Sequence, residues 1–314
     1  MPKKVTSRKL VIVVGPTASG KSELAVKIAK EIAGEIISAD SRQIYKGMDI
    51  GSGKVAGKWT HIKNKNGAQK KVYLYKKIPH YLIDEASPRI QYSVTKFQKK
   101  AQTVIEDIFK RGKIPIICGG TAHWVDSIAF GQHFPEIKPN KEIRTTLAQL
   151  TTGEMYQKLI ALDPARAKTI DPKNHRRLIR ALEIIQLTGK PVPPPKQKPQ
   201  YDITWLGLDP DPKTLETKIH KRLKLRLNQG MLTEVEHLHK MGLSWKRLES
   251  FGLEYKFCAL LLQGNIAKNE FEEKLFTAIR QYTKRQKTWW KRNLEIRWAE
   301  NPNTLLALVK NQEG

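Results

Sequence analysis

The chain has 314 residues, which is long enough for one large domain or two ordinary ones. It carries 57 Lys and Arg against 30 Asp and Glu, a net charge of +27 that destabilises a compact protein unless an anionic partner neutralises it. No apolar run approaches the roughly 18 residues that span a membrane, and the basic N-terminus lacks an apolar signal core, which argues against a membrane protein and a secreted one.

This charge favours nucleic acid as the anionic partner, because a polyanion binds Lys- and Arg-rich surfaces through its phosphates. The alternative is a solvated lysine-rich surface without such a partner. The two cysteines, Cys118 and Cys258, fit a reducing compartment, and nothing suggests a disulfide between them. We therefore expect a cytoplasmic protein with no membrane partner.

The N-terminal segment predicts a phosphate-binding site. Residues 10–14, LVIVV, are typical of a buried parallel strand, and residues 15–22, GPTASGKS, match the phosphate-loop pattern G-x-x-x-x-G-K-[ST] before a helical pattern. Backbone N–H groups and the helix N-terminus of such a loop point at an anion. Lys21 would contact the terminal phosphates, and Ser22 would be the Mg²⁺ ligand. The predicted diphosphate-binding residues are Gly15, Pro16, Thr17, Ala18, Ser19, Gly20, Lys21 and Ser22.

A second strand is predicted at residues 35–40, EIISAD, and it ends in an acid. Because ligands bind beyond the carboxyl ends of strands in open α/β sheets, Asp40 should lie near Lys21 and the bound phosphates. The alternative for Asp40 is a helix cap or a turn residue. The next residues, SRQIY, mix hydrogen-bond donors with an aromatic ring, which suits contact with a nucleobase or an RNA backbone.

The motifs GPTASGKSELA and ISADSRQIYKGMDIG resemble the tRNA dimethylallyltransferase family, also called tRNA isopentenyltransferases. Further matches follow in order and cover nearly the whole chain: IPHYLID at 78–84, YSVTKFQ at 92–98, IPIICGGT at 114–121, NHRRLIRALEI at 174–184 and RQYTKRQKTWWKRN at 280–293. The resemblance implies an α/β fold, with a P-loop NTPase-like parallel sheet flanked by helices and an all-helical insertion domain. We expect residues 1–133 to form the first part of the core, 134–200 the insertion, and 201–314 the rest of the core with basic C-terminal helices.

Residues 55–77 depart from the family pattern, which runs almost directly between the flanking motifs. Two strand-like runs at 61–63 and 71–75 flank Asn66-Gly67, a strong hairpin-turn signal. We predict an inserted basic hairpin, which either touches RNA or is a solvated appendage.

An amphipathic helix at 94–111 and a buried strand at 114–118 lead to Gly119-Gly120-Thr121. The Thr121 hydroxyl could donate to a phosphate or to the nucleobase. The next residues, Ala122-His123-Trp124, replace the Gly-Leu/Met-Tyr of the family, which leaves the choice of prenyl donor open. His123 could act as a base, but a packed or surface histidine is favoured.

Prolines separate short helical segments in residues 134–200, where four arginines are candidates for tRNA contact. Arg176 and Arg180 share one helical face, and guanidinium groups suit RNA phosphates and base edges. Matching arginines of the family contact tRNA; the alternative is a solvated helix face with Glu183 as intrahelical partner. The four candidates are Arg144, Arg176, Arg177 and Arg180.

The C-terminal part returns to a strand at 203–208 and an amphipathic helix at 214–228, in which the match to the family makes Arg222 the diphosphate clamp. The last long helix, 270–293, has seven Lys or Arg between 274 and 292 and no acid there. Apolar residues Phe271, Leu275, Ile279 and Tyr282 predict its buried stripe, and we expect the other face to contact tRNA.

The resemblance implies transfer of a dimethylallyl group from dimethylallyl diphosphate to N6 of the adenosine 3′-adjacent to the anticodon in tRNA, with release of diphosphate. Asp40 is the candidate general base, Arg222 and Lys21 would stabilise the leaving diphosphate with Mg²⁺ on Ser22, and Thr121 would orient the phosphate or the base. We expect a monomer that binds the tRNA anticodon arm. The predicted tRNA-binding residues are Asp40, Ser41, Arg42, Gln43, Thr121, Arg144, Arg176, Arg177 and Arg180.

Three other functions compete with this interpretation. An adenylate isopentenyltransferase would share the phosphate loop but prenylate a free nucleotide. A small-molecule kinase would need a strand that ends in a magnesium-binding Asp, for which Asp84 is the only loose candidate. A non-catalytic RNA-binding protein would not need Lys21, Ser22 and Asp40 together. The predicted helical insertion and the charge favour tRNA as substrate.

Overall fold

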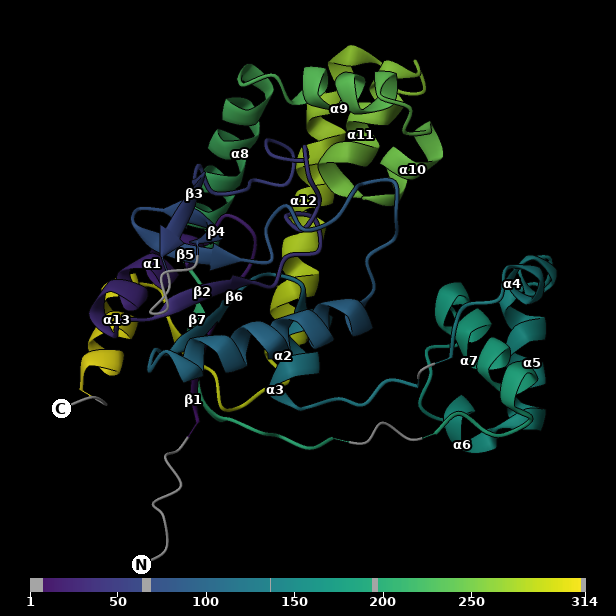
Figure 1. Cartoon of the computed structure of the whole chain (residues 1–314). Helices are drawn as coiled ribbons and strands as arrows, with labels where there is room; N and C mark the ends of the chain where they lie inside the picture. The colour runs from purple at the N-terminus through teal and green to yellow at the C-terminus, as the bar shows by residue number, and fades with distance from the viewer. Residues whose placement is uncertain (1–7, 64–68, 136, 194–196, 312–314) are drawn as a thin grey trace, which may run out of the picture. The chain divides into compact units, whose positions relative to one another are not determined.

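The computed structural model describes residues 8–63, 69–135, 137–193 and 197–311. The chain divides into two compact units, of which the smaller is residues 131–198 and the larger contains the rest of the chain (Figure 1). The smaller unit coincides closely with the predicted insertion at 134–200.

The larger unit is built on one sheet with the strand order β3-β4-β5-β2-β6-β1-β7-β8 in the described part of the chain. Every pairing from β5 through β8 is parallel, as predicted for a phosphate-loop α/β fold. The parallel strands are β1 (Lys9–Val14), β2 (Glu35–Ser38), β5 (Ile78–Tyr81), β6 (Pro115–Cys118), β7 (Asp202–Leu208) and β8 (Arg297–Ala299).

Strand β1 lies inside the sheet, and its side chains alternate between two apolar cores. Val11 and Val13 pack with α1 (Lys21–Glu31) and α13 (Pro302–Lys310). Leu10, Ile12 and Val14 belong to the other core, to which the remaining helices of this unit contribute. These helices are α2 (Val94–Lys110), α3 (Ala122–Ala129), α8 (Pro212–Asn228), α9 (Met231–Lys240), α10 (Trp245–Ser250), α11 (Leu253–Leu262) and α12 (Lys268–Trp290). Because both faces of β1 are covered, its continuous apolar sequence is that of a buried parallel strand.

The inserted residues form an antiparallel hairpin of β3 (Lys58–Lys63) and β4 (Gln69–Tyr75). Strand β4 pairs antiparallel with β5, so the hairpin extends the parallel sheet and makes it mixed. The predicted Asn66-Gly67 turn lies outside the described residues.

The smaller unit is a helical cluster with its own apolar core, which includes Met155, Leu159, Leu178 and Leu182. Its helices are α4 (Lys141–Leu147), α5 (Thr152–Leu162), α6 (Pro164–Ala167) and α7 (His175–Thr188).

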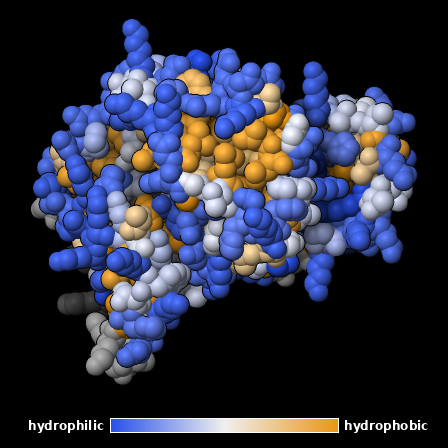
Figure 2. Space-filling model, turned by 90° about the horizontal axis from the view of Figure 1, so that it is seen from above, coloured by the Kyte–Doolittle hydropathy of each residue, from blue (hydrophilic) through white to orange (hydrophobic). Residues whose placement is uncertain are grey.

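The surface seen in Figure 2 is mainly hydrophilic around one apolar area. The exposed large apolar side chains of the larger unit include Leu225, Met241 and Leu262, on or next to α8, α9 and α11. Among the described residues, no helix has the length and apolar character needed to cross a membrane.

Candidate active site

A cavity of about 320 Å³ lies beyond the carboxyl ends of β2 and β6. It is lined by the phosphate loop, by the segments that follow these two strands, and by residues of α8, α11 and α12. The structure therefore brings together predicted residues from distant parts of the chain. Those that line the cavity are Thr17, Lys21, Ser22, Asp40, Ser41, Arg42, Gln43, Thr121 and Arg222.

The phosphate loop, residues 15–20, is fixed by close backbone packing. A Cβ atom on Gly15 would lie 2.4 Å from the carbonyl oxygen of Leu208, so only glycine fits there. Gly20, with a φ of 100°, starts α1 in a conformation that also favours glycine. The Lys21 Nζ atom folds back and donates to the carbonyl of Pro16 at 3.2 Å. The loop is thus preformed around the lysine that the sequence assigns to phosphate.

Five cations line this cavity: Lys21, Arg42, Arg222, Arg226 and Arg285. Burial lowers the pKa of Lys21 below its usual range, and the charge of Arg222 adds to the effect. Burial likewise lowers the pKa of Arg222 to about 9, with a further contribution from Arg226. Arg222 also donates from Nη2 to the Thr17 hydroxyl. Positive charges held close together in a buried cavity repel one another, and this repulsion costs free energy. A bound anion would relieve that cost, so the cavity is suited to a diphosphate.

Asp40 and Thr121 lie where β2 and β6 end, and the two segments are joined by hydrogen bonds. The Oδ1 atom of Asp40 accepts from the Arg42 N–H at 2.9 Å. The Thr121 hydroxyl oxygen accepts from the Ser41 N–H at 3.0 Å and lies 3.2 Å from Ser41 Oγ. Thr121 therefore holds the residue next to Asp40, in addition to lining the cavity.

Arg42 and Gln43 line the cavity but also tie its walls together. Arg42 donates from Nε to the carbonyl of Phe251. The Gln43 side chain accepts from the Ser38 hydroxyl at 3.0 Å and donates to the carbonyl of Gly53 at 3.2 Å. Both residues thus have structural contacts besides any that they make with RNA.

The loop at 49–53 is held by a carboxylate that the sequence interpretation missed. Glu234 accepts hydrogen bonds from the N–H groups of Asp49, Ile50 and Gly51, at 2.8, 2.7 and 3.0 Å, and from the Tyr255 hydroxyl at 2.8 Å. It therefore fixes one wall of the cavity from α9.

Arg226 holds the same wall from α8. Its Nη1 atom donates to Glu254 at 2.8 Å and to the Gly51 carbonyl at 3.3 Å. Gly53 has a φ of 63°, a conformation that favours glycine, and the missing Cβ atom leaves room for the Arg226 guanidinium group. The signal in the sequence was the spacing of four between Arg222 and Arg226, which puts both on one face of a helix.

Gln286 is a third residue of the site that was not predicted from the sequence. It is buried on α12, where Oε1 accepts from the Thr17 N–H at 2.9 Å and Nε2 donates to the Gly120 carbonyl at 2.9 Å. It thereby fixes the phosphate loop against the segment that carries Thr121.

Helix α12 presents more of its surface to the cavity than its apolar pattern predicted. Phe271, Leu275 and Ile279 are buried as expected. Tyr282, which was predicted to continue this stripe, instead lines the cavity beside Arg285. Burial raises the pKa of Tyr282 to about 12, so its phenol stays neutral. Residues that pack in the core and residues that line a cavity recur at the same helical spacing. The sequence pattern therefore could not distinguish Tyr282 from the buried residues of α12.

The four candidate arginines of the insertion belong to the smaller unit. Arg144 and Arg180 contact the buried carboxylate of Glu183 at 2.7 and 2.6 Å. Burial alone would raise the pKa of Glu183, but these hydrogen bonds lower it to about 2. Arg144 and Arg180 therefore support the structure of the unit, with side chains 38% and 32% exposed. Arg176 and Arg177 are open to solvent.

The cavity also fits the predicted magnesium ion. Among the described residues, no group of three or more His, Cys, Asp or Glu could hold a metal. Mg²⁺ needs no such cage, because it commonly binds through one or two protein oxygens, water and the phosphates of a substrate. Ser22 supplies a hydroxyl to the same cavity as the phosphate loop.

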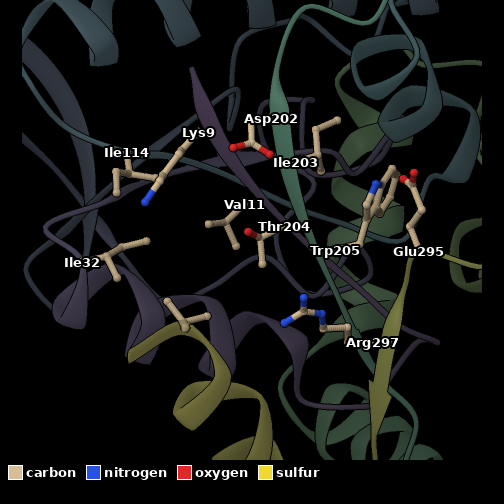
Figure 3. A pocket seen from close by; sticks show the side chains of 11 residues that line it. Lys9, Val11, Ile32, Ile114, Asp202, Ile203, Thr204, Trp205, Glu295 and Arg297 are labelled. Atoms are coloured by element: carbon tan, nitrogen blue, oxygen red, sulfur yellow. The ribbon is translucent and has the colours of Figure 1, made fainter. Parts of the chain in front are cut away.

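Another hollow, of about 550 Å³, lies where β1 and β7 begin (Figure 3). Its lining includes Lys9, Asp202 and Arg297, which are exposed, and none of the predicted site residues. It is at the amino ends of the strands, opposite the edge where ligands of this fold bind. The smaller cavity is therefore the candidate active site.

A phosphate loop that shares a cavity with buried cations and a carboxylate defines a phosphate-loop protein built to act on a phosphate ester. The IPP transferase family model matches residues 43–293, and the chain belongs to that family. The family resemblance predicted from the motifs is thus confirmed.

Relatives with assigned functions match nearly the whole chain. It is 40% identical over 301 residues to the tRNA dimethylallyltransferase of Thermoanaerobacter sp. (strain X514), with 92% of this chain and 91% of the relative covered. It is 37% identical to tRNA dimethylallyltransferase 1 of Geotalea daltonii, with 95% and 92% covered.

Solved structures of tRNA-modifying prenyltransferases also match the chain. The tRNA isopentenylpyrophosphate transferase of Bacillus halodurans matches with a TM-score of 0.68 and 31% identity, covering 98% of this chain and 95% of that one. A eukaryotic dimethylallyltransferase acting on tRNA matches with a TM-score of 0.73 and 26% identity, covering 90% and 70%.

Replacement of Gln286 by Leu should damage both the fold and donor binding. The change leaves the Thr17 N–H and the Gly120 carbonyl without their buried partner, at a cost of about 2 kcal/mol. We expect a lower melting temperature and a KM for the donor raised by about tenfold, as the loop loses its fixed position. Gln281→Leu, at an exposed position of the same helix, is the matched control. Equal melting and donor kinetics of the two variants would contradict this role.

Proposed function

We propose that this protein transfers a dimethylallyl group from dimethylallyl diphosphate to N6 of the adenosine 3′-adjacent to the anticodon in tRNA, and releases diphosphate. One observation carries the proposal: Asp40 opens onto the same cavity as the cations Lys21, Arg222 and Arg226. A general base and a site for a diphosphate leaving group are what this transfer requires. Relatives named tRNA dimethylallyltransferase support the choice of substrates.

At the donor end, the allylic C–O bond breaks and negative charge develops on the diphosphate. Lys21, Arg222 and the N–H groups of the phosphate loop stabilise that charge, and the buried setting strengthens their effect. Ser22 would hold Mg²⁺, which supplies further positive charge to the diphosphate when it is bound.

At the acceptor end, a C–N bond forms to the exocyclic amine, whose lone pair is delocalised into the adenine ring. Asp40 accepts the N6 proton as this bond forms, and its Oδ2 atom has no hydrogen-bond partner among the described residues. Thr121 and Ser41 keep the Asp40 segment in place. The adenosine leaves its stack to reach the cavity, which costs less in a loop than in a duplex.

Recognition of tRNA on this proposal uses the large net charge of +27 and the exposed Arg176 and Arg177. Arg42 and Gln43 would contact the loop that carries the adenosine. The protein acts as a cytoplasmic monomer and consumes no nucleoside triphosphate.

A kinase function is disfavoured because, among the described residues, no suitable carboxylate is placed to bind its magnesium ion. Strand β6 ends in Cys118 and is followed by two glycines, so it supplies no magnesium-binding carboxylate. Asp84, the other candidate, forms an ion pair with Lys54, which is 2% exposed. An enzyme for free nucleotides would have no need of the arginine-bearing helical unit.

The test is an incubation of the purified protein with labelled dimethylallyl diphosphate, Mg²⁺ and unmodified tRNA, with AMP in a parallel reaction. We expect label on tRNA only. Label on AMP would reassign the protein to free nucleotides, and ATP consumption without label would make it a kinase.

Donor binding should depend on pH through Lys21. Only protonated Lys21 attracts the diphosphate, and its pKa in the free enzyme lies below the usual value. Donor binding is therefore complete below that lowered pKa and is lost as the pH rises through it. Bound diphosphate raises the pKa again, so kcat/KM for the donor should fall at lower pH than kcat does. In Lys21→Arg the fall in kcat/KM should move to higher pH; an unchanged profile would exclude Lys21 as its source.

A further inference from the structure

The inserted hairpin has no part in the proposed reaction, yet its composition is extreme. Residues 55–77 contain seven lysines and one histidine and no acidic residue. Strand β3 is the outer edge of the sheet, so one long side of the hairpin is open to solvent. A lysine-rich edge strand prevents unwanted pairing with other sheets, and that need alone could explain the lysines.

The exposed face of the hairpin carries more than lysines. Trp59 is 41% exposed, and the Lys71 Nζ atom lies 5.2 Å from the centre of its ring. Tyr73 supports the indole edge-on, with ring centres 5.5 Å apart. His61 is paired with Lys71 in the strand register and is also exposed. Preventing strand pairing at the sheet edge does not require a large aromatic ring exposed to solvent. Nucleic-acid binding, in contrast, combines such a ring with cations.

The hairpin is also held rigidly next to the phosphate loop. The Tyr75 hydroxyl and Lys76 Nζ contact Glu23 at 2.6 and 2.5 Å, and Glu23 is in the first turn of α1, directly after Ser22. At the base of the hairpin, the Tyr73 hydroxyl donates to the Val55 carbonyl at 2.6 Å. A surface fixed in this way loses little conformational entropy when it binds a partner.

We propose that this face of the hairpin, formed by Trp59, His61 and Lys71, is an additional RNA-binding surface that contacts the tRNA substrate beside the active site. Lys71 pairs with a phosphate, and Trp59 stacks on an unpaired base. The proposal rests on the proposed function for the identity of the RNA.

The composition of the surface favours RNA over the diphosphate donor. Trp59, His61 and Lys71 share one side of the hairpin, whereas Lys58, which pairs with Leu74, lies on the other side. The face therefore combines a cation with an exposed aromatic ring, while the cavity already provides a diphosphate with cations. An RNA offers both a phosphate and an unpaired base to such a face.

Two variants test the proposal, with a matched control. Lys71→Glu and Trp59→Ala each remove one component of the face. Lys30→Glu makes the same charge change as Lys71→Glu at an exposed position in the last turn of α1, at the other end of that helix from the phosphate loop. Binding of fluorescent unmodified tRNA is measured by anisotropy over a series of salt concentrations, and melting temperatures confirm folding.

We expect Lys71→Glu and Trp59→Ala each to weaken tRNA binding by about tenfold. Lys71→Glu should also reduce the slope of log Kd against log salt by about one, while Lys30→Glu stays near wild type. The KM for dimethylallyl diphosphate and kcat at saturating tRNA should not change. If Trp59→Ala fails to fold, Lys71→Glu decides the matter.

Two results would overturn the proposal. If Lys71→Glu and Trp59→Ala bound tRNA as tightly as Lys30→Glu does, the lysines of the hairpin would serve only to protect the sheet edge. If instead the KM for dimethylallyl diphosphate rose while tRNA affinity stayed unchanged, the face would contact the donor. Prenylation by the wild-type protein is measured in parallel. Loss of tRNA affinity in the variants of a protein that does not prenylate would support the surface and refute only the proposed function.

Discussion

Replacement of Asp40 by Asn should lower kcat for prenyl transfer by a factor of about 10² to 10⁴ and leave the Kd for tRNA nearly unchanged. The amide keeps the size of the side chain and can still accept the Arg42 N–H at Oδ1. It cannot accept the N6 proton, so only the chemical step should suffer. Single-turnover transfer and tRNA binding are measured on the same variant.

The outcome separates chemistry from recognition. An equal loss of transfer and tRNA binding in Asp40→Asn would make Asp40 a contact residue and remove it as general base. The same assays on Asp40→Ala reveal whether the turn at Arg42 matters, because alanine removes the hydrogen bond as well.

The second large effect concerns Lys21. Lys21→Met should lower kcat/KM for the donor by about 10³, because the ammonium group stabilises the charge that develops on the leaving diphosphate. Without ligand, however, the variant should melt no lower than the wild type. Burial lowers the pKa of Lys21, which means that the fold disfavours its charged form, so removal of the charge relieves a cost. Diphosphate should raise the melting temperature of the wild type and not that of the variant.

Lys54→Met is the matched control for this prediction. Lys54 is also buried, but its ammonium group is paired with Asp84 and lies 2.5 Å from Asp49. Its loss leaves Asp84 without its cation and should destabilise the protein by about 3 kcal/mol. If Lys21→Met were destabilised as much as Lys54→Met, the charge of Lys21 would be stabilising in the free protein. That result would contradict the view that Lys21 has no anionic partner among the described residues until diphosphate binds.

The main residues of the candidate site could be placed together from the sequence, because they follow short local patterns. The phosphate loop is a contiguous motif, and Asp40 and Thr121 each follow a buried strand. Since the carboxyl ends of parallel strands meet at one edge, their proximity to Lys21 followed from the fold class alone. Arg222 followed only from the family resemblance, because its helix has an ordinary amphipathic pattern.

The supporting residues could not be predicted in the same way. Gln286 contacts Thr17 across 269 positions in the chain, and nothing in its local sequence distinguishes it from other polar residues of α12. Glu234 acts through three backbone N–H groups, which no side-chain pattern reveals. Arg144 and Arg180 were predicted as RNA contacts, and the structure adds a role that the sequence did not show, because both offset the charge of the buried Glu183. Such roles depend on packing that exists only in the folded chain.

The most direct measurement is the position of the product on the RNA. After reaction with dimethylallyl diphosphate, tRNA is digested with a base-specific nuclease, and its fragments are read by mass beside those of a tRNA with guanosine in place of the adenosine 3′-adjacent to the anticodon. We expect one dimethylallyl group, on N6 of that adenosine, one diphosphate released per group, and no product with the guanosine tRNA. A prenyl group elsewhere on the RNA, or diphosphate release without an RNA adduct, would contradict the proposed function.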